Sequence, residues 1–105
     1  MSFELACAPS DVPEDEALGV TIGSYDVAIA RHGDEFFAIQ DLCSHAAVAL
    51  SEGEVEECTV ECWLHGSRFD LRTGKPTGPP AVQPVPVYPV TVDGQRVLVD
   101  VDAPL

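Results

Sequence analysis

The chain has 105 residues, a length that allows one domain with one modest hydrophobic core. Eighteen acidic residues against five basic ones give a net charge of −13, which disfavours binding to nucleic acid or to anionic membrane surfaces. No apolar run approaches the ~20 residues of a membrane-spanning helix, and the first residues lack the pattern of a secretory signal. We therefore expect a soluble cytoplasmic protein.

The first forty residues read as a meander of short antiparallel strands. Gly23-Ser24 is typical of a two-residue hairpin turn with glycine first, and residues 31–34 form a second polar turn. Apolar and β-branched residues alternate on either side of these turns. The predicted strands are residues 3–7, 20–22, 25–30 and 35–40.

The middle of the chain, from residue 41 to about residue 80, loses this regularity. It contains only short β-prone pieces, at residues 58–61 and 68–71. An insert of about forty residues is long for a plain connection, so we predict a functional subdomain here.

Strand patterning returns near the C-terminus. Three prolines restrict the segment around Val85–Val92 to an edge or an irregular strand. Asp93-Gly94 is a strong hairpin signal, and valines alternate after it. Since no long helical pattern is visible, the sequence predicts one all-β domain over residues 1–105, an antiparallel β-sandwich or barrel with the subdomain at about 41–80 inserted between scaffold strands.

Two short motifs inside the insert each offer one thiol and one imidazole. They are Cys43-Ser44-His45 and Cys62-Trp63-Leu64-His65, separated by sixteen residues. One interpretation is a structural zinc site, although zinc sites usually group cysteines with cysteines and histidines with histidines. A catalytic Cys–His dyad leaves the second pair unexplained. A [2Fe–2S] centre with two thiolates on one iron and two imidazoles on the other accommodates both mixed pairs.

The two motifs, their spacing and the segment Gly66-Ser67-Arg68-Phe69-Asp70 after the second resemble the cluster-binding motifs of Rieske proteins. The chain looks most like the Rieske-type ferredoxins of aromatic ring-hydroxylating dioxygenase systems. The resemblance implies one [2Fe–2S] cluster per chain. Cys43 and Cys62 would bind the inner iron, and His45 and His65 the outer, more exposed iron.

Further positions match or depart from the family pattern. Gly66 matches a glycine that follows the last ligand, where a side chain would crowd the loop, and residues 78–80 resemble the family's proline loop. The disulfide that ties the two loops in respiratory Rieske subunits is absent, because its positions are Val48 and Leu64. Phe69 stands where those subunits carry a tyrosine hydroxyl near a ligand sulfur. Fewer hydrogen bonds to sulfur and the acidic charge predict a redox potential in the lower half of the Rieske range of about −150 to +300 mV.

The remaining notable residues have simpler interpretations. Cys7 and Cys58 have no neighbouring histidine and are expected to be small buried apolar side chains. Trp63 stands where the family usually has proline, and it suits cluster shielding, partner contact or local packing equally. His32 is expected to be a surface residue of a polar turn.

The function implied by the resemblance is that of a one-electron carrier with no catalysis of its own. It would be a monomer that accepts electrons from a flavin-dependent reductase and passes them to a ring-hydroxylating oxygenase or a similar redox acceptor. Two alternatives stay open at this point. The chain suits the small Rieske subunit of a larger redox enzyme such as nitrite reductase, and it suits a zinc-binding, non-redox interaction module.

Overall fold

The computed structural model describes residues 3–43, 48–63, 66–78 and 83–104, and predictions that fall on other positions lie outside the described residues. Within these ranges every strand pairing is antiparallel, which confirms the all-β prediction. No helix in the described ranges is long and apolar enough to cross a membrane. The elements are β1 (Glu4–Cys7), η1 (Pro9–Asp11), β2 (Ala17–Ile22), β3 (Tyr25–His32), β4 (Glu35–Gln40), η2 (Leu50–Glu52), β5 (Val55–Glu56), β6 (Thr59–Glu61), β7 (Arg68–Asp70), β8 (Val87–Tyr88), β9 (Val90–Asp93) and β10 (Arg96–Val99).

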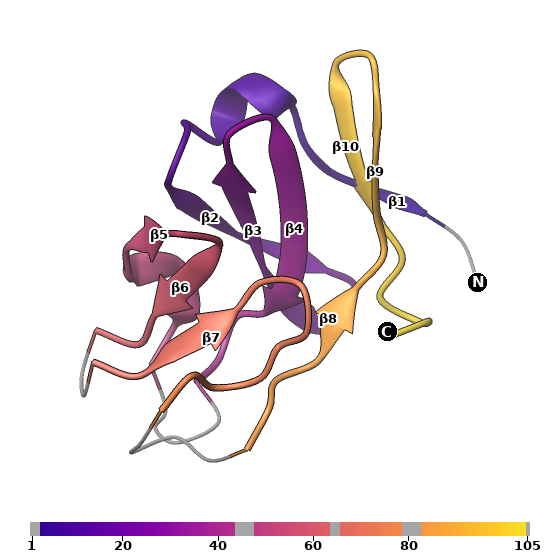
Figure 1. Ribbon diagram of the computed structural model, residues 1–105. Coiled ribbons are helices and arrows are strands. Elements are labelled where there is room, and N and C mark those ends of the chain that lie inside the picture. The colour runs from indigo at the N-terminus through magenta and orange to yellow at the C-terminus, as the bar shows by residue number, and fades with distance from the viewer. Residues whose placement is uncertain (1–2, 44–47, 64–65, 79–82, 105) are drawn as a thin grey trace.

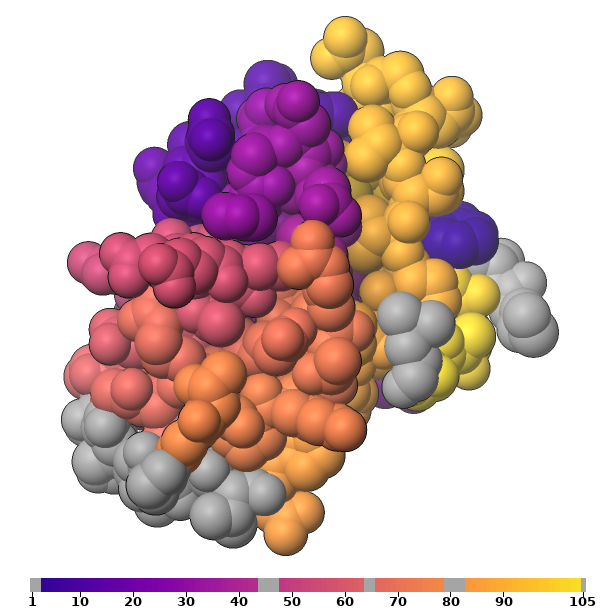
Figure 2. Space-filling model, in the orientation of Figure 1, coloured from indigo at the N-terminus to yellow at the C-terminus, as the bar shows by residue number. Residues whose placement is uncertain are grey.

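The strands form three sheets that stack as three layers. The central sheet has the order β2-β3-β4-β8, one outer sheet has the order β1-β10-β9, and the other has the order β5-β6-β7. The two outer sheets lie on opposite sides of the central sheet (Figure 1). In the space-filling view, the β5–β7 sheet and the residues that follow it form one lobe against β4 (Figure 2).

Strand β3 is buried on both faces because it lies in the middle layer. Its four consecutive buried residues alternate between two cores. Val27 and Ile29 pack toward the β1-β10-β9 sheet, whereas Ala28 and Ala30 pack toward the β5–β7 sheet. Successive side chains of a strand point to opposite faces, so the two small alanines allow the β5–β7 sheet to approach closely.

The predicted hairpins are present, with one shift of register. Ile22 pairs with Tyr25 across the predicted Gly23-Ser24 turn, and Gly23 has a φ of 62°. At the C-terminal hairpin, Asp93 itself pairs with Arg96, so the turn residues are Gly94-Gln95 rather than Asp93-Gly94. Gly94, with a φ of 63°, therefore takes the first turn position, where a positive φ suits glycine.

The proline-rich segment behaves as predicted. Strand β8 has only two residues and forms the edge of the central sheet. Pro89 then separates β8 from β9, which belongs to a different sheet. Proline has no N–H to donate to a ladder, and the pairing of β8 with the central sheet ends just before this position.

Position 53 requires a glycine because the backbone of Glu61, beside the second motif, passes very close to it. A Cβ atom at this position would lie 1.7 Å from the carbonyl oxygen of Glu61, the residue before Cys62. We expect Gly53→Ala to lower the free energy of unfolding by about 3 kcal/mol, because backbone atoms must move apart. Chemical denaturation measures this change.

Gly78→Ala is the matched control for this prediction. No described heavy atom lies within 4 Å of a Cβ at Gly78, so the same substitution is expected to leave stability unchanged or to raise it by up to about 1 kcal/mol. Equal stability of the Gly53→Ala and Gly78→Ala proteins would show that the close approach is not a constraint.

Candidate metal centre

The first motif begins directly after strand β4, in a loop that is closed by hydrogen bonds. The Cys43 amide donates to the Val48 carbonyl at 3.0 Å, across the six-residue span that contains the predicted ligand His45. Upstream, the Asp41 amide donates to the Asp26 carbonyl on β3 at 2.9 Å. The base of the loop is thus tied to the central sheet.

A carboxylate clamp joins the two ends of this first loop. One oxygen of Asp41 accepts the Ser51 amide at 2.7 Å, and the other accepts the Ser51 hydroxyl at 2.7 Å. A Cβ at Gly19 would lie 2.7 Å from the Asp41 carboxylate, so β2 packs its glycine directly against the clamp. Sequence analysis missed this pair, and an aspartate two residues before a candidate ligand was the only signal for it.

Removal of the contact between Asp41 and Ser51 is expected to lower the stability of the fold. Asp41→Ala leaves the Ser51 amide and hydroxyl without their partner, which is expected to cost about 1–3 kcal/mol of unfolding free energy. We also expect faster bleaching of the visible absorption in the presence of a chelator. Asp34→Ala is the control, because that carboxylate is fully exposed, and it should behave as wild type. Identical bleaching rates for the two variants would contradict a role for the clamp.

The second motif forms the loop between β6 and β7. Glu61 pairs with Arg68 at its base, and their side chains form an ion pair at 3.4 Å. The Cys62 amide donates to the Ser67 carbonyl at 2.6 Å, which closes a second six-residue span. The Gly66 amide in turn donates to the Cys62 carbonyl at 2.8 Å. The two motif loops therefore share the same closure, from each cysteine to the residue five positions later.

Gly66 is needed for its backbone conformation rather than for space. Its φ is 76°, in the left-handed region, which favours glycine. No described heavy atom lies within 4 Å of a Cβ at this position. The expectation that a side chain would crowd the loop is therefore not supported by the described residues.

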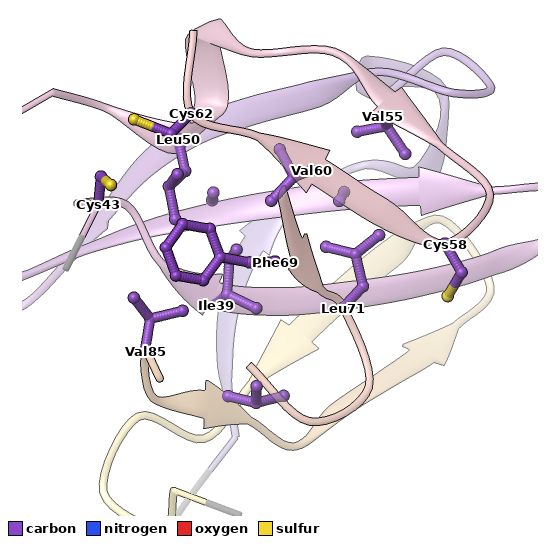
Figure 3. Close-up of a cluster of buried hydrophobic side chains, with 13 residues drawn as sticks. Ile39, Cys43, Leu50, Val55, Cys58, Val60, Cys62, Phe69, Leu71 and Val85 are labelled. Atoms are coloured by element: carbon purple, nitrogen blue, oxygen red, sulfur yellow. The ribbon is translucent and has the colours of Figure 1, made fainter. Parts of the chain in front are cut away.

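The two loops bring the candidate thiol ligands to one end of a hydrophobic core. Cys43 is 3% exposed and Cys62 is 0% exposed, and both belong to the core between the central and β5–β7 sheets. Figure 3 shows them together at one end of this core, with the ring of Phe69 beside them. Thiolate sulfurs buried in apolar surroundings suit an iron–sulfur cluster, whose potential depends on solvent exclusion.

The other half of the predicted ligand set lies outside the described residues. His45 and His65 are not among them, and the same is true of Leu64, Pro79 and Pro80. Among the described residues no third histidine, cysteine, aspartate or glutamate joins the two cysteines in a metal-binding group. The donor chemistry of the described half fits the sulfur side of a [2Fe–2S] centre with mixed ligands.

Two positions that depart from the respiratory Rieske pattern are apolar and belong to the core that contains the candidate thiols. Phe69 is fully buried, and Val48 packs against the same core, so neither offers a polar group to the site. Trp63 is 50% exposed, and Leu42, which precedes Cys43, is 45% exposed. A large, half-exposed apolar side chain thus stands next to each candidate ligand cysteine. Packing within the chain covers only half of the Trp63 surface, and the other half faces solvent.

The other two cysteines, Cys58 and Cys7, lie away from the candidate site. Cys58 lies at the opposite end of the core from Cys43 (Figure 3), and its sulfur accepts a hydrogen bond from Arg72 at 2.9 Å. Arg72 also contacts Glu35 on β4 at 3.1 Å and so joins the β5–β7 lobe to the central sheet. Burial raises the pKa of the Cys58 thiol, although Arg72 opposes this shift. Cys58 is buried as predicted, whereas Cys7 is half-buried.

His32 forms part of a surface contact, as expected for a polar turn. Its Nδ1 lies 3.2 Å from a carboxylate oxygen of Asp15, at the end of β3 that is remote from both motif loops. Cys43 follows β4 at the opposite end of that hairpin, where β3 begins. His32 therefore takes no part in the candidate site.

Comparisons with protein families and with known relatives also indicate a Rieske protein, over most of the chain. The Rieske [2Fe-2S] domain family matches residues 2–89. The biphenyl dioxygenase ferredoxin subunit of Pseudomonas sp. strain KKS102 is 46% identical over 101 residues, covering 95% of this chain and 93% of that protein.

Solved structures agree with this result. The ferredoxin of carbazole 1,9a-dioxygenase from Nocardioides aromaticivorans IC177 superposes with a TM-score of 0.89 at 36% identity, covering 94% of this chain and 97% of that one. A chain from the complex of reduced oxygenase and oxidized ferredoxin in carbazole 1,9a-dioxygenase has a TM-score of 0.85 at 35% identity, covering 92% of this chain and 91% of that one. Fold, buried thiols and relatives agree, and the chain belongs to the Rieske [2Fe-2S] domain family, whose cofactor is one [2Fe–2S] cluster.

Proposed function

We propose that this chain is a cytoplasmic one-electron carrier that passes electrons from a flavin-dependent reductase to a ring-hydroxylating oxygenase. The observation that carries the proposal is the burial of Cys43 and Cys62 at the same end of one core, on two loops of equal closure. The relatives named above are ferredoxin subunits of dioxygenases, and one was solved in a complex with an oxygenase.

The proposed ligand set is Cys43 and Cys62 on the inner iron and His45 and His65 on the outer iron. The whole chain, 1–105, acts as a single Rieske domain in which residues from about 41 to 80 bind the cluster. When bound, the cluster supplies the uptake and release of one electron at a time. The chain's own residues exclude water from the sulfur side, where Phe69 is fully buried.

The surface around the two loops supports transient docking. Leu42 and Trp63 adjoin the ligand cysteines and are about half exposed, as expected for side chains that a partner covers. The net charge of −13 favours partners with basic docking surfaces and opposes nucleic acid and anionic membranes. We propose that the carrier works as a monomer, because one cluster per chain with one docking end is sufficient for shuttling.

Electron transfer to an oxygenase tests the proposal directly. The chemically reduced chain is mixed in a stopped-flow instrument with the oxidised oxygenase component of a biphenyl dioxygenase. Reoxidation of the chain with matching reduction of the oxygenase is the expected result. The apo-chain, stripped of iron, is the control. A holo-chain that stays reduced in the presence of the oxygenase contradicts the assignment.

The redox potential is expected to lie in the lower part of the Rieske range. Phe69 contributes no hydroxyl to a ligand sulfur, and the acidic chain disfavours the more negative reduced state. We therefore predict a midpoint below about +100 mV, measured by spectroscopic redox titration. A midpoint above about +100 mV would show that hydrogen bonding to the cluster has a source other than the position of Phe69.

A further inference from the structure

Trp63 is the only tryptophan of the chain, and it stands between two proposed cluster ligands in the sequence. Cys62 directly precedes it, and His65 follows two residues later. Half of the Trp63 surface is exposed, and the residue belongs to neither hydrophobic core. Among the described residues its ring makes no aromatic or cation–π contact, and its indole N–H donates no hydrogen bond. The chain therefore leaves a large apolar surface and one hydrogen-bond donor available at this position.

Other residues close the second loop and bury its thiol. Cys62 is already fully buried, and the core ring beside it belongs to Phe69, which is itself fully buried (Figure 3). The loop is closed by the backbone hydrogen bonds from Cys62 to Ser67 and from Gly66 to Cys62. None of these contacts uses the indole. The exposed half of Trp63 therefore contributes neither to the closure of the loop nor to the burial of its thiol.

Electron transfer determines what covers this surface. The rate of electron transfer falls steeply with distance, so a redox partner must come into close contact with the cluster. Trp63 directly follows a proposed ligand of the inner iron, and a partner that reaches the cluster therefore covers the indole as well. Single exposed apolar residues are common and need no explanation, but tryptophan is enriched among the residues that carry most of the binding energy of interfaces.

The carboxylates that flank the two motifs are already engaged within the chain. Both oxygens of Asp41 accept hydrogen bonds from Ser51, and Glu61 forms an ion pair with Arg68 at 3.4 Å. The side chains directly next to the two ligand cysteines are instead apolar and about half exposed. The net charge of −13 steers a partner from a distance, whereas the side chains that it meets beside the thiol ligands are apolar.

We propose that Trp63 is the main docking contact of this carrier, and that its indole enters an apolar pocket on the oxygenase beside the electron-accepting centre. An indole buries a large apolar area, and its N–H usually finds an acceptor when it is covered, so the pocket is expected to offer an oxygen atom at its rim. The inference rests on the proposed function for the identity of the partner. It adds to that function the residue that binds the partner and the chemistry of the surface that receives it.

Fluorine NMR with 5-fluorotryptophan observes this contact directly, because a chain with one tryptophan gives one resonance. The labelled, oxidised holo-chain is titrated with the unlabelled, oxidised oxygenase component of a biphenyl dioxygenase, so that binding occurs without electron transfer. In the free chain the resonance is expected to shift when H2O is exchanged for D2O, because the indole is exposed. In the complex most of this solvent response is expected to disappear. A resonance that keeps its full solvent response in the complex overturns the proposal.

Matched variants measure the contribution of the indole. With the oxygenase as electron acceptor, Trp63→Ala is expected to raise the apparent KM for the reduced chain at least about tenfold and to leave kcat unchanged. Trp63→Phe keeps an apolar ring and is expected to stay within about threefold of wild type. Phe3→Ala is the control, because that ring is also 46% exposed but directly precedes β1, in the outer sheet on the other side of the central sheet (Figure 1). Its KM is expected to stay within about twofold of wild type.

Three further readouts separate docking from cluster shielding. The ratio of the KM values of Trp63→Ala and wild type is expected to be the same at low and at high salt, because the lost contact is apolar. The midpoint potential of Trp63→Ala and the rate at which a chelator bleaches it are expected to equal those of wild type. A shifted midpoint or faster bleaching, with an unchanged KM, assigns Trp63 to cluster shielding and overturns the proposal.

Failure of this inference is distinguishable from failure of the proposed function. Equal KM values for Trp63→Ala and Phe3→Ala, with electron transfer intact, reject the docking contact and leave the carrier function standing. Loss of the solvent response with a reductase component but not with the oxygenase rejects the partner named here. A wild-type chain that neither binds nor reduces the oxygenase rejects the proposed function, and the docking contact with it.

Discussion

Replacing Cys43 or Cys62 with alanine is expected to abolish iron binding, whereas the same replacement at Cys7 or Cys58 leaves about two irons per chain. Each of the first two residues supplies one of the two thiolates that the proposed ligand set requires. Alanine offers no donor atom, so the remaining three ligands cannot complete the inner iron. Iron content and visible absorption of the purified chains measure the outcome.

The four cysteine variants form their own control set. All four lose one sulfur, and Cys58 is buried in the same core as the two proposed ligands. Loss of packing alone would therefore affect Cys58→Ala as much as Cys62→Ala. If Cys58→Ala loses its iron while Cys62→Ala keeps it, the assignment of Cys62 as a ligand is wrong.

Phe69→Ala is expected to lower the free energy of unfolding by about 3–5 kcal/mol. Phe69 is among the largest fully buried side chains, and it lies on β7, between the two cysteines and the apolar residues beneath them. Removing the ring leaves a cavity that the surrounding strands cannot fill without moving the second loop. Chemical denaturation of the holo-chain provides the measurement, with iron content as the second readout.

Two further variants keep this prediction decisive if Phe69→Ala does not fold. Phe69→Leu retains most of the volume and is expected to cost about 1–2 kcal/mol. Phe3→Ala removes an aromatic ring that is 46% exposed, and a change below about 0.5 kcal/mol is expected. A Phe69→Leu protein as stable as wild type would contradict the role of this ring as the support of the site.

Local patterns account for most of the scaffold. Glycine at a turn followed by alternating residues predicted the β2–β3 hairpin, and the prolines predicted a short edge strand at β8. Strand β5 was missed because two residues carry no periodicity, and its turn at Glu57 and Cys58 has no glycine despite two positive φ values, of 52° and 60°. The C-terminal hairpin turn lies one residue later than predicted, at Gly94-Gln95, because strand register depends on pairing across the sheet.

The metal centre was predicted only where its parts are local in sequence. Each motif carries its own cysteine and histidine, so the pattern indicated candidate ligands, and the resemblance to Rieske proteins implied which iron each would bind. The Asp41–Ser51 clamp joins residues ten positions apart and depends on the approach of Gly19 from another strand. The ring contact between Tyr25 and Tyr88 likewise joins β3 to β8, more than sixty residues later. Contacts of this kind form only when the chain is folded, and no local sequence pattern predicts them.

A redox titration of the purified chain, followed by electron paramagnetic resonance, separates an iron–sulfur electron carrier from a zinc-binding module. We expect a coloured protein that takes up one electron per chain and then gives the rhombic signal of a mixed histidine and cysteine [2Fe–2S] centre. A colourless chain that contains zinc and takes up no electron would contradict the assignment as an electron carrier.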